Sequence, residues 1–485
     1  MRPANARPAA NRSRLALIIA SLAAFMAFLD TTIVNIAFPA LQHAFPGEPT
    51  SSISWVLNAY NIVFAALLVS AGQLADRYTR RKLFMIGLTL FTLASGCCAL
   101  APSLSALIAL RAIQAAGAAI LIPTGIALLL RAFAPEQQIR AIALLAAVSG
   151  VAFAAGPSLG GILIHTVGWR SIFLINVPIG VVTLLMAYRY IRPDRLHLPL
   201  SSPRVPDLAG ALLVLLGIGL LALAIVQGNT WGWGNERTLA SFIAAACLLG
   251  AALRRAATHP APAIDLDLFR APRFTVASIA VFAFAIGLAA KLLCDILFMT
   301  SVWHYSELET GFAVSASPLI TAAFASTAAR VAIRIGIRPA AALGGALYAC
   351  GCAWYVLRMG TQPHYLSEYL PGTVFTGAGI ALLLPTLTSA AMLAVPSARL
   401  AAGAGINSMI RQVGAVLGVA LFVAIIGSPA PGSALSAFHH GWTLAAIAAG
   451  VAALAALALR ADAPTPAEAV RIFRRSAQSH PTRAA

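Results

Sequence analysis

The sequence predicts an all-α integral membrane protein, and three observations support this fold class. Of the 485 residues, 60% are hydrophobic and only 10% are charged, and the mean hydropathy is +0.86. Soluble domains are usually nearer half apolar and a quarter charged. Apolar stretches of about 20 residues, the length that spans a bilayer, recur from Arg14 to Arg460. Backbone in hydrocarbon must satisfy its own hydrogen bonds, so we expect helices rather than the alternating strands of a barrel.

The first half of the chain contains six of the fourteen expected helices. Its N-terminus is basic and then apolar, as in a signal peptide, but the apolar run from Leu15 to Pro39 is too long for one. We therefore expect a first spanning helix that is retained. Breaks that carry Pro, Gly and charge separate the helices that follow. The expected spans are 14–39, 53–72, 83–101, 105–130, 138–165 and 169–190.

The second half contains eight expected helices, of which the first two form an insertion. The expected spans are 207–228, 238–256, 274–303, 311–330, 339–358, 368–394, 400–427 and 441–460. Six plus two plus six helices indicate a duplicated transporter with an inserted hairpin. The domains are then a cytoplasmic tail (1–13), a six-helix bundle (14–192), a cytoplasmic linker (193–206), the hairpin (207–256), a second six-helix bundle (274–460) and a disordered cytoplasmic tail (461–485).

The formal charge of +18 acts as an orientation signal. If the helices alternate from a cytoplasmic N-terminus, all but six of the 33 Lys and Arg residues fall on the cytoplasmic side. The exceptions are Arg170, Arg237 and Arg358 in outer loops and Arg111, Lys291 and Arg411 within helices. The pattern predicts a bacterial inner-membrane protein with both termini in the cytoplasm. It favours contact with anionic lipid and excludes nucleic acid as a partner.

The sequence does not favour an enzyme or an ATP-driven transporter. Neither of its two lysines, Lys82 and Lys291, lies in a glycine-rich phosphate-binding loop. No zinc-protease motif occurs, and we expect the pair His439–His440 in an outer loop. The one Gly-x-Ser-x-Gly match, Gly156–Gly160, falls inside the expected helix 138–165 and not at the strand-to-helix turn that a serine hydrolase needs. The six cysteines lie in apolar stretches and are interpreted as small core residues. We therefore expect neither an enzyme nor a metal site.

Asp30 is the most informative residue because it lies more than halfway along the first helix. A carboxylate inside a bilayer is costly, so it should face a cavity or a partner, and such residues are functional by default. Asp30 can thus serve as a site that binds and releases protons. The alternative is a carboxylate that is merely hydrogen-bonded to Thr31, Asn35 or a neighbouring helix.

Five segments together resemble the fourteen-helix drug:proton antiporter branch of the major facilitator superfamily. They are Leu29–Pro39, Gly72–Lys82, Arg111–Ala119, Gly156–Gly161 and Trp169–Gly180. The resemblance covers nearly the whole chain. It implies the major facilitator fold, with two six-helix bundles and two extra helices between them. It also implies alternating access driven by the proton-motive force, without a cofactor.

The resemblance assigns roles to two of these motifs. The first motif is implied to be a latch that holds the outward-facing state, and its residues are Gly72, Asp76, Arg77, Arg80 and Arg81. We expect Gly72 to end a helix. The alternative is a basic loop that only orients the protein in the membrane. The second motif consists of Gly156, Pro157, Gly160 and Gly161, and the resemblance connects it with exporters. These residues let a helix bend and let another helix pack closely against it. The alternative is generic packing of small residues.

The chain departs from the family pattern in several places. Thr79, Ala115 and Ala152 stand where glycine is usual. The second half's counterpart of the loop motif, Ala329–Arg338, keeps its basic residues but has lost the acidic one, which puts a symmetric latch in doubt.

Arg111 is the second charged residue of the predicted coupling site. The resemblance makes it a neighbour of Asp30, with Gln114 on the same helix face one turn on. A guanidinium keeps its proton, so it must find acceptors if it is buried. The alternative is an arginine that extends to the membrane interface.

Lys291 and Asp295 are the least expected charges in the chain. They are four residues apart and so share a helix face. The simplest interpretation is a neutralising ion pair within one helix, because isolated charges are costly in a membrane. The second hypothesis is that Asp295 lines the cavity as a second protonation site or a substrate site.

Further polar residues within the helices are candidates for a cavity lining, each with a structural role as the alternative. They are Asn35, Asn58, Tyr60, Asn61, Gln114, Arg411 and Gln412. For Arg411 and Gln412 we favour helix packing or a gate over contact with substrate.

We therefore expect a proton-coupled antiporter that exports drugs or other small amphipathic molecules. Its expected partners are a lipophilic small molecule and the bilayer, with the protein a monomer; a periplasmic adaptor stays an open question. One alternative is an exporter of a single endogenous metabolite or siderophore. Another is a non-transporting sensor on the same fold.

Overall fold

The computed structural model describes residues 6–77, 79–133, 135–191, 207–260, 262–396, 399–427 and 434–459. Within these ranges, fourteen helices are long and apolar enough to cross a membrane. The expected tail 461–485 and the expected linker 193–206 lie outside the described residues. Of the expected tail 1–13, residues 1–5 and the side chains of residues 6–12 also lie outside them.

The N-terminal bundle is built from helices that run back and forth. They are α1 (Ala6–Ile36), α2 (Phe38–Ala44), α3 (Thr50–Arg77), α4 (Arg80–Ala99), α5 (Leu104–Ala132), α6 (Pro135–Val167), α7 (Ser171–Leu174) and α8 (Asn176–Tyr190). α2 and α7 are short connectors at one end of the bundle. Ser103 caps α5 by accepting a hydrogen bond from the Ala106 amide, as its short polar side chain favours.

The C-terminal bundle follows the inserted hairpin. The hairpin consists of α9 (Leu208–Trp231) and α10 (Glu236–Thr258), and a 3₁₀ turn, η1 (Leu266–Arg270), leads out of it. The bundle then contains α11 (Pro272–Ser301), α12 (Glu307–Ile335), α13 (Ile337–Arg358), the π-helical turn η2 (Tyr365–Tyr369), α14 (Leu370–Leu393), α15 (Leu400–Ile426) and α16 (Ala434–Leu457). Ser306 and Glu309 form a reciprocal capping box at the start of α12.

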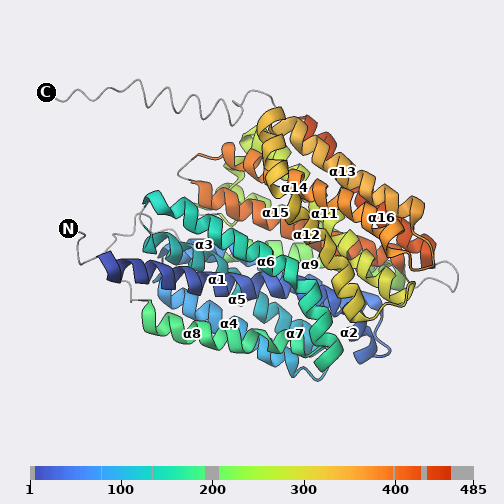
Figure 1. Cartoon of the computed structure of the whole chain (residues 1–485), viewed down its shortest axis with the longest axis horizontal. Coiled ribbons are helices and arrows are strands. Elements are labelled where there is room, and N and C mark those ends of the chain that lie inside the picture. The colour runs from blue at the N-terminus through green and yellow to red at the C-terminus, as the bar shows by residue number, and fades with distance from the viewer. Residues whose placement is uncertain are drawn as a thin grey trace.

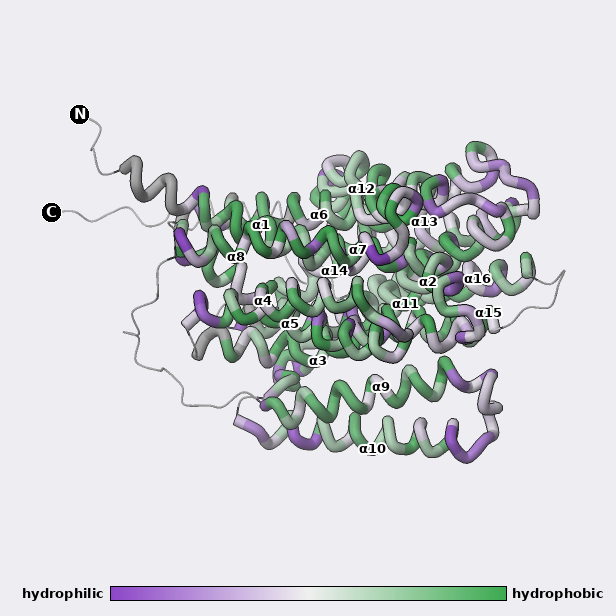
Figure 2. Tube along the Cα trace, turned by 90° about the horizontal axis from the view of Figure 1, so that it is seen from below, coloured by the Kyte–Doolittle hydropathy of each residue, from purple (hydrophilic) through white to green (hydrophobic). Residues whose placement is uncertain are grey.

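The two bundles lie side by side with their helices roughly along the long axis of the molecule (Figure 1). They meet along two pairs of helices, α6 with α12 and α3 with α15. α9 also packs against both α3 and α15, so the hairpin lies over one of these two seams. In Figure 2 the hairpin lies along one edge of the molecule, hydrophobic in the middle and hydrophilic at its ends.

An ion pair between a buried carboxylate and a partly exposed arginine holds the base of the hairpin. Asp207 caps α9 through the Gly210 amide and also accepts a hydrogen bond from Arg255 of α10, 2.5 Å away. Burial alone would raise the pKa of Asp207, but these two hydrogen bonds and the Arg255 charge outweigh it and lower the pKa. The carboxylate therefore stays charged and ties the two helices of the hairpin together.

One end of the molecule is rich in basic residues. It is the end where α1 begins, and Arg81, Arg254 and Arg338 lie there on other helices. We call it the basic end and the other the opposite end.

Two sequence expectations about helix ends were wrong. Gly72 does not end a helix, because the following Gln, Leu and Ala are good helix formers and α3 continues to Arg77. His439 and His440 lie within α16, which starts at Ala434 rather than near 441. The His439 ring faces the Met359 carbonyl at 3.2 Å and packs against Trp442, so tertiary contacts extend the helix beyond its apolar core.

Candidate functional site

Asp30 forms the centre of a buried polar cluster in the N-terminal bundle. Its side chain is 0% exposed, six residues before the end of α1. One carboxylate oxygen, Oδ2, accepts a hydrogen bond from Nη1 of Arg111 at 2.5 Å. The other oxygen, Oδ1, accepts from Gln114 at 2.9 Å and from Asn176 at 3.2 Å. We call Asp30, Arg111, Gln114 and Asn176 the Asp30 cluster.

Arg111 does not reach the membrane interface, since it is 1% exposed. Besides Asp30, its guanidinium donates to Gln114 Oε1 at 2.7 Å and to the Val56 carbonyl at 3.3 Å. It also lies over the Tyr60 ring, 4.2 Å from the centroid. Arg111 thus has acceptors and an aromatic face that do not depend on Asp30.

Two members of this site were missed from the sequence. Asn176 begins α8, and its amide group bridges Asp30 Oδ1 and the Ser95 hydroxyl of α4. Ser95 in turn donates to the Phe173 carbonyl at 2.9 Å. Asn176 belongs to the segment Trp169–Gly180 that carried the family resemblance. That membership was the one feature of the sequence that could have indicated a role for Asn176.

The glycines of the exporter motif pack α6 onto α1 beside Asp30. A Cβ atom on Gly156 would overlap the Thr32 side chain, and one on Gly160 would lie 2.9 Å from the Ile33 side chain. Thr32 and Ile33 are the second and third residues after Asp30. The small residues therefore determine how closely α6 approaches the segment that carries the carboxylate.

Gly161 of the same motif contacts the other bundle. A Cβ atom there would lie 2.6 Å from the Glu307 carbonyl oxygen of α12. On the facing helix, a Cβ atom on Gly311 would lie 2.5 Å from the Pro157 carbonyl oxygen. The two bundles are thus in backbone contact at the opposite end in this conformation.

The expected latch is described only in part. The side chains of Asp76 and Arg77 lie outside the described residues. Arg81 donates to the Tyr188 carbonyl of α8 at 2.8 Å and lies over the Tyr188 ring. Arg80 is the first residue of α4. A Cβ atom on Gly72 would meet no described atom within 4 Å, so close packing does not require glycine there.

Lys291 and Asp295 form a second buried cluster, in the C-terminal bundle. Their ammonium nitrogen and Oδ2 oxygen are 2.5 Å apart. Oδ2 also accepts from the Tyr369 hydroxyl at 2.9 Å, and Oδ1 accepts from the Trp442 indole at 2.8 Å. The ammonium lies 4.9 Å from the centroid of the Tyr355 ring. We call these five residues the Asp295 cluster.

The other candidate cavity residues differ in their surroundings. Asn61 of α3 accepts a hydrogen bond from Gln412 of α15 at 3.4 Å, so this contact joins the two bundles. Asn35 donates back to Thr31 of its own helix. Within the described residues, neither polar atom of the fully buried Asn58 has a hydrogen-bond partner. Arg411, beside Gln412, is half-buried.

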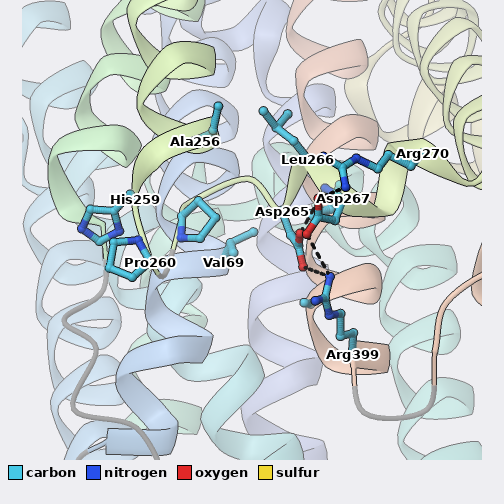
Figure 3. A pocket seen from close by; sticks show the side chains of 13 residues that line it. Val69, Ala256, His259, Pro260, Asp265, Leu266, Asp267, Arg270 and Arg399 are labelled. Carbon is cyan, nitrogen blue, oxygen red and sulfur yellow. Dashed lines mark hydrogen bonds and ion pairs between the residues drawn. The ribbon is translucent and has the colours of Figure 1, made fainter.

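A cavity of about 500 Å³ lies at the basic end, away from both clusters. It is bounded by the loop after α10, by Val69 of α3 and by the start of α15. Figure 3 shows Arg399 pointing at the two carboxylates of Asp265 and Asp267, at 3.3 and 3.6 Å. These side chains are a quarter to a half exposed, so the contacts contribute little stability.

A smaller, almost wholly apolar cavity of about 270 Å³ lies among α1, α5 and α6. Its lining includes Ala24, Phe28, Leu121 and Ile142. Phe28 is two residues before Asp30, so this cavity extends from the carboxylate segment toward the basic end. Among the described residues, no three His, Cys, Asp or Glu side chains are grouped so that they could hold a metal ion.

Comparisons with known proteins agree with this architecture. The Major Facilitator Superfamily profile matches residues 20–298. Multidrug resistance protein Stp of Mycobacterium tuberculosis is 33% identical over 86% of this chain and 77% of its own length. Cephamycin export protein CmcT of Amycolatopsis lactamdurans is 32% identical over 91% of each chain.

A solved structure shows the same fold at lower sequence similarity. The crystal structure of an auto-inhibited POT family peptide transporter superposes with a TM-score of 0.68, covering 92% of this chain and 96% of that one. At 17% identity, this likeness concerns the fold alone. From its profile match, its relatives and its fourteen helices, the chain belongs to the major facilitator superfamily, in its fourteen-helix branch.

Proposed function

We propose that this protein exports lipophilic small molecules, drugs among them, in exchange for protons, and that Asp30 is the proton-binding site. The printed names of two relatives, a multidrug resistance protein and a cephamycin export protein, support export of drug-like compounds. The proton-motive force supplies the energy, since one charge that crosses 100 mV is worth about 2.3 kcal/mol. The protein acts as a monomer in the inner membrane with its basic end in the cytoplasm.

The observation that carries this proposal is the redundancy within the Asp30 cluster. When Asp30 takes up a proton, Arg111 loses its counter-charge but keeps Gln114, the Val56 carbonyl and the Tyr60 ring as partners. A buried cation without partners would cost several kcal/mol. The cluster therefore tolerates both protonation states of Asp30, which a proton-coupling site requires.

Protonation also changes the charge that a substrate meets. With Asp30 ionised, the Asp30–Arg111 pair is neutral; with Asp30 protonated, the cluster carries the positive charge of Arg111. A positive cluster disfavours a cationic substrate nearby, because charges interact strongly in a poorly screened interior. A proton and a cationic substrate thus exclude one another. The apolar cavity beside Phe28 offers a place for the lipophilic part of the substrate.

Alternating access requires the seam between the bundles to open at each end in turn. The contacts of Gly161 with Glu307 and of Gly311 with Pro157 must separate for release to the outside. A latch holds the basic end closed in the outward-facing state, and it consists of Gly72, Asp76, Arg77, Arg80 and Arg81. The hydrogen bond from Gln412 to Asn61 is one of the inter-bundle contacts that change during the cycle.

A narrow exporter of one endogenous metabolite is the second candidate. It is favoured by the relative named for the export of a single antibiotic class, cephamycin. Both candidates use the same proton site. They differ in substrate breadth, which a panel of compounds measures.

The test uses everted membrane vesicles energised to an acidic interior, which contain either the wild type or Asp30→Asn. Lipophilic cations and other drugs are added, and proton release from the vesicle interior is followed with a pH-sensitive dye. We expect proton release with the wild type, and with Asp30→Asn only the background seen in vesicles from cells that lack this protein. Asp265→Asn, a carboxylate at the distant 500 Å³ cavity, is the matched control and should behave as wild type.

Wild-type proton release from Asp30→Asn vesicles would show that Asp30 is not the coupling site. If folded wild type responds to no compound of the panel, the narrow-exporter candidate replaces the multidrug one.

A further inference from the structure

The two buried carboxylates occupy corresponding places in the two bundles. Asp30 lies six residues before the end of α1, the first helix of its bundle, and Asp295 lies six residues before the end of α11, the first helix of the second bundle. Major facilitator bundles are related by an internal repeat, so corresponding positions can be compared.

The helices that hold the two carboxylates also correspond. α1 packs against α5 and α8, the fourth and sixth spanning helices of its bundle, and α11 packs against α14 and α16, the fourth and sixth of the other. The Asp30 cluster draws its donors from α5 and α8. The Asp295 cluster draws two of its donors from the spans of α14 and α16, namely Tyr369 and Trp442. The same architectural site is therefore built twice with different side chains.

The cations of the two clusters differ in one chemical respect. The guanidinium of Arg111 does not release its proton in proteins, whereas a lysine ammonium can. Lys291 Nζ and Asp295 Oδ2 are 2.5 Å apart, within reach of direct proton transfer. In that transfer an Nζ–H bond breaks and an Oδ2–H bond forms, and an ion pair becomes a neutral amine and a carboxylic acid.

Asp295 has two neutral hydrogen-bond donors besides Lys291. The carboxylate would keep the Tyr369 hydroxyl and the Trp442 indole as neutral donors, and Lys291 would stay beside the Tyr355 ring. This redundancy parallels that of Arg111 in the Asp30 cluster. If Lys291 served only to neutralise Asp295, the carboxylate would not need further hydrogen-bond donors such as Tyr369 and Trp442.

We propose that Lys291 and Asp295 form a second proton-exchange site, the repeat counterpart of Asp30, which holds one proton that can leave during the transport cycle. This inference rests on the proposed function, because it adds a second proton to the same exchange. The titratable groups that face the pair are Cys294 on α11, Tyr348, Cys352 and Tyr355 on α13, Tyr365 and Tyr369 on η2, and, beside Trp442, His439 on α16.

The experiment counts protons bound by the purified full-length protein in nanodiscs. The difference in bound protons between about pH 9 and about pH 5 is measured for each variant by titration against protein-free nanodiscs. The decisive variant is Lys291→Met with Asp295→Asn, which removes both charges together and avoids an unpaired buried ion. We expect it to exchange about one proton fewer than wild type, and Asp30→Asn likewise about one fewer.

Trp442→Phe supplies a second readout that does not remove either charge. It deletes one donor to Asp295. If the pair exchanges a proton, the count stays at the wild-type value while the pH at which that proton is exchanged shifts. A permanent ion pair shows no such shift. Melting temperatures confirm that each variant is folded.

The outcomes separate this inference from the proposed function. An unchanged proton count in the Lys291→Met, Asp295→Asn variant, with one proton lost in Asp30→Asn, would overturn the second site and leave the first. If the double variant exchanges one proton fewer and Asp30→Asn exchanges as many as wild type, the second site is supported and Asp30 is not a proton-binding site. Unchanged counts in both variants would overturn both proposals.

Discussion

Arg111 is the residue on which the stability of the Asp30 cluster depends most. It is the one member of the cluster that donates to Asp30, to Gln114 and to the backbone at Val56. Lysine could not replace it, because a single ammonium cannot reach three acceptors that are arranged around a planar group. Its role can therefore be separated into charge and geometry by paired substitutions.

We predict that Arg111→Ala is strongly destabilising and that Asp30→Asn largely rescues it. The single variant leaves the Asp30 carboxylate buried without its counter-ion, which costs about 3–5 kcal/mol. Asp30→Asn removes that charge, so the double variant should melt close to wild type. Thermal melting in detergent measures both, and neither variant should transport. A single variant that melts like wild type would mean that the ion pair does not stabilise the fold.

The residues of the cluster differ in how far they could be predicted. Asp30 and Arg111 stand out because charged side chains are rare in apolar helices, and a rare residue must have a specific environment. Asn176 and Ser95 are uncharged and common at helix ends, so only the folded structure reveals that they support Asp30. The partners of Asp295 were missed for the same reason, since tyrosine and tryptophan are also typical of membrane interfaces.

At the scale of helices, the number of spans could be predicted and their ends could not. Hydropathy marks the part of a helix that lies in lipid, whereas the helix itself continues as long as caps and packing satisfy its backbone. α12 shows this, because its capping box at Ser306 and Glu309 starts the helix four residues before the expected 311–330. The expected first helix, 14–39, ended two residues into α2, and the rest of α2 was not predicted as a helix because Gln42 and His43 interrupt its apolar run.

Among the helices, α6 makes the contact that best reports the conformational state. Its Gly161 lies against the backbone of α12 at the opposite end, whereas a Cβ atom on Gly150 of the same helix would meet no described atom within 4 Å. A larger side chain at Gly161 must therefore separate the bundles, while the same change at Gly150 meets open space.

We predict that Gly161→Val shifts the protein toward the conformation that is open at the opposite end. Overpacking costs the closed arrangement about 1–3 kcal/mol, which changes a two-state population about 5- to 150-fold. Spin labels at the exposed positions Val167 and Phe312 report the separation of α6 and α12 by pulsed distance measurement. Gly150→Val should leave the distance distribution unchanged. An unchanged distribution in Gly161→Val would mean that the α6–α12 contact does not control opening.

At the scale of the whole molecule, the sequence predicted two bundles and an insertion, but not how the insertion docks. α9 packs on α3 of one bundle and on α15 of the other, and Asn229 donates to the Ala424 carbonyl of α15. Such contacts depend on which face of an almost uniformly apolar helix is turned inward, and hydropathy carries no signal for that. The correspondence of Asp30 and Asp295 also became visible only when the two bundles could be compared.

The last prediction concerns how the whole molecule lies in the membrane. The basic end carries Arg81, Arg254 and Arg338, and translocating such charges is unfavourable, so we expect this end to stay in the cytoplasm. In a cysteine-free background, Trp233→Cys at the opposite end and Arg338→Cys at the basic end are both exposed positions. A membrane-impermeant maleimide added to intact cells should label the first and should label the second only after permeabilisation. The reverse pattern would place the basic end outside and would invert the direction of the proposed transport, because protons would then reach Asp30 from the wrong side.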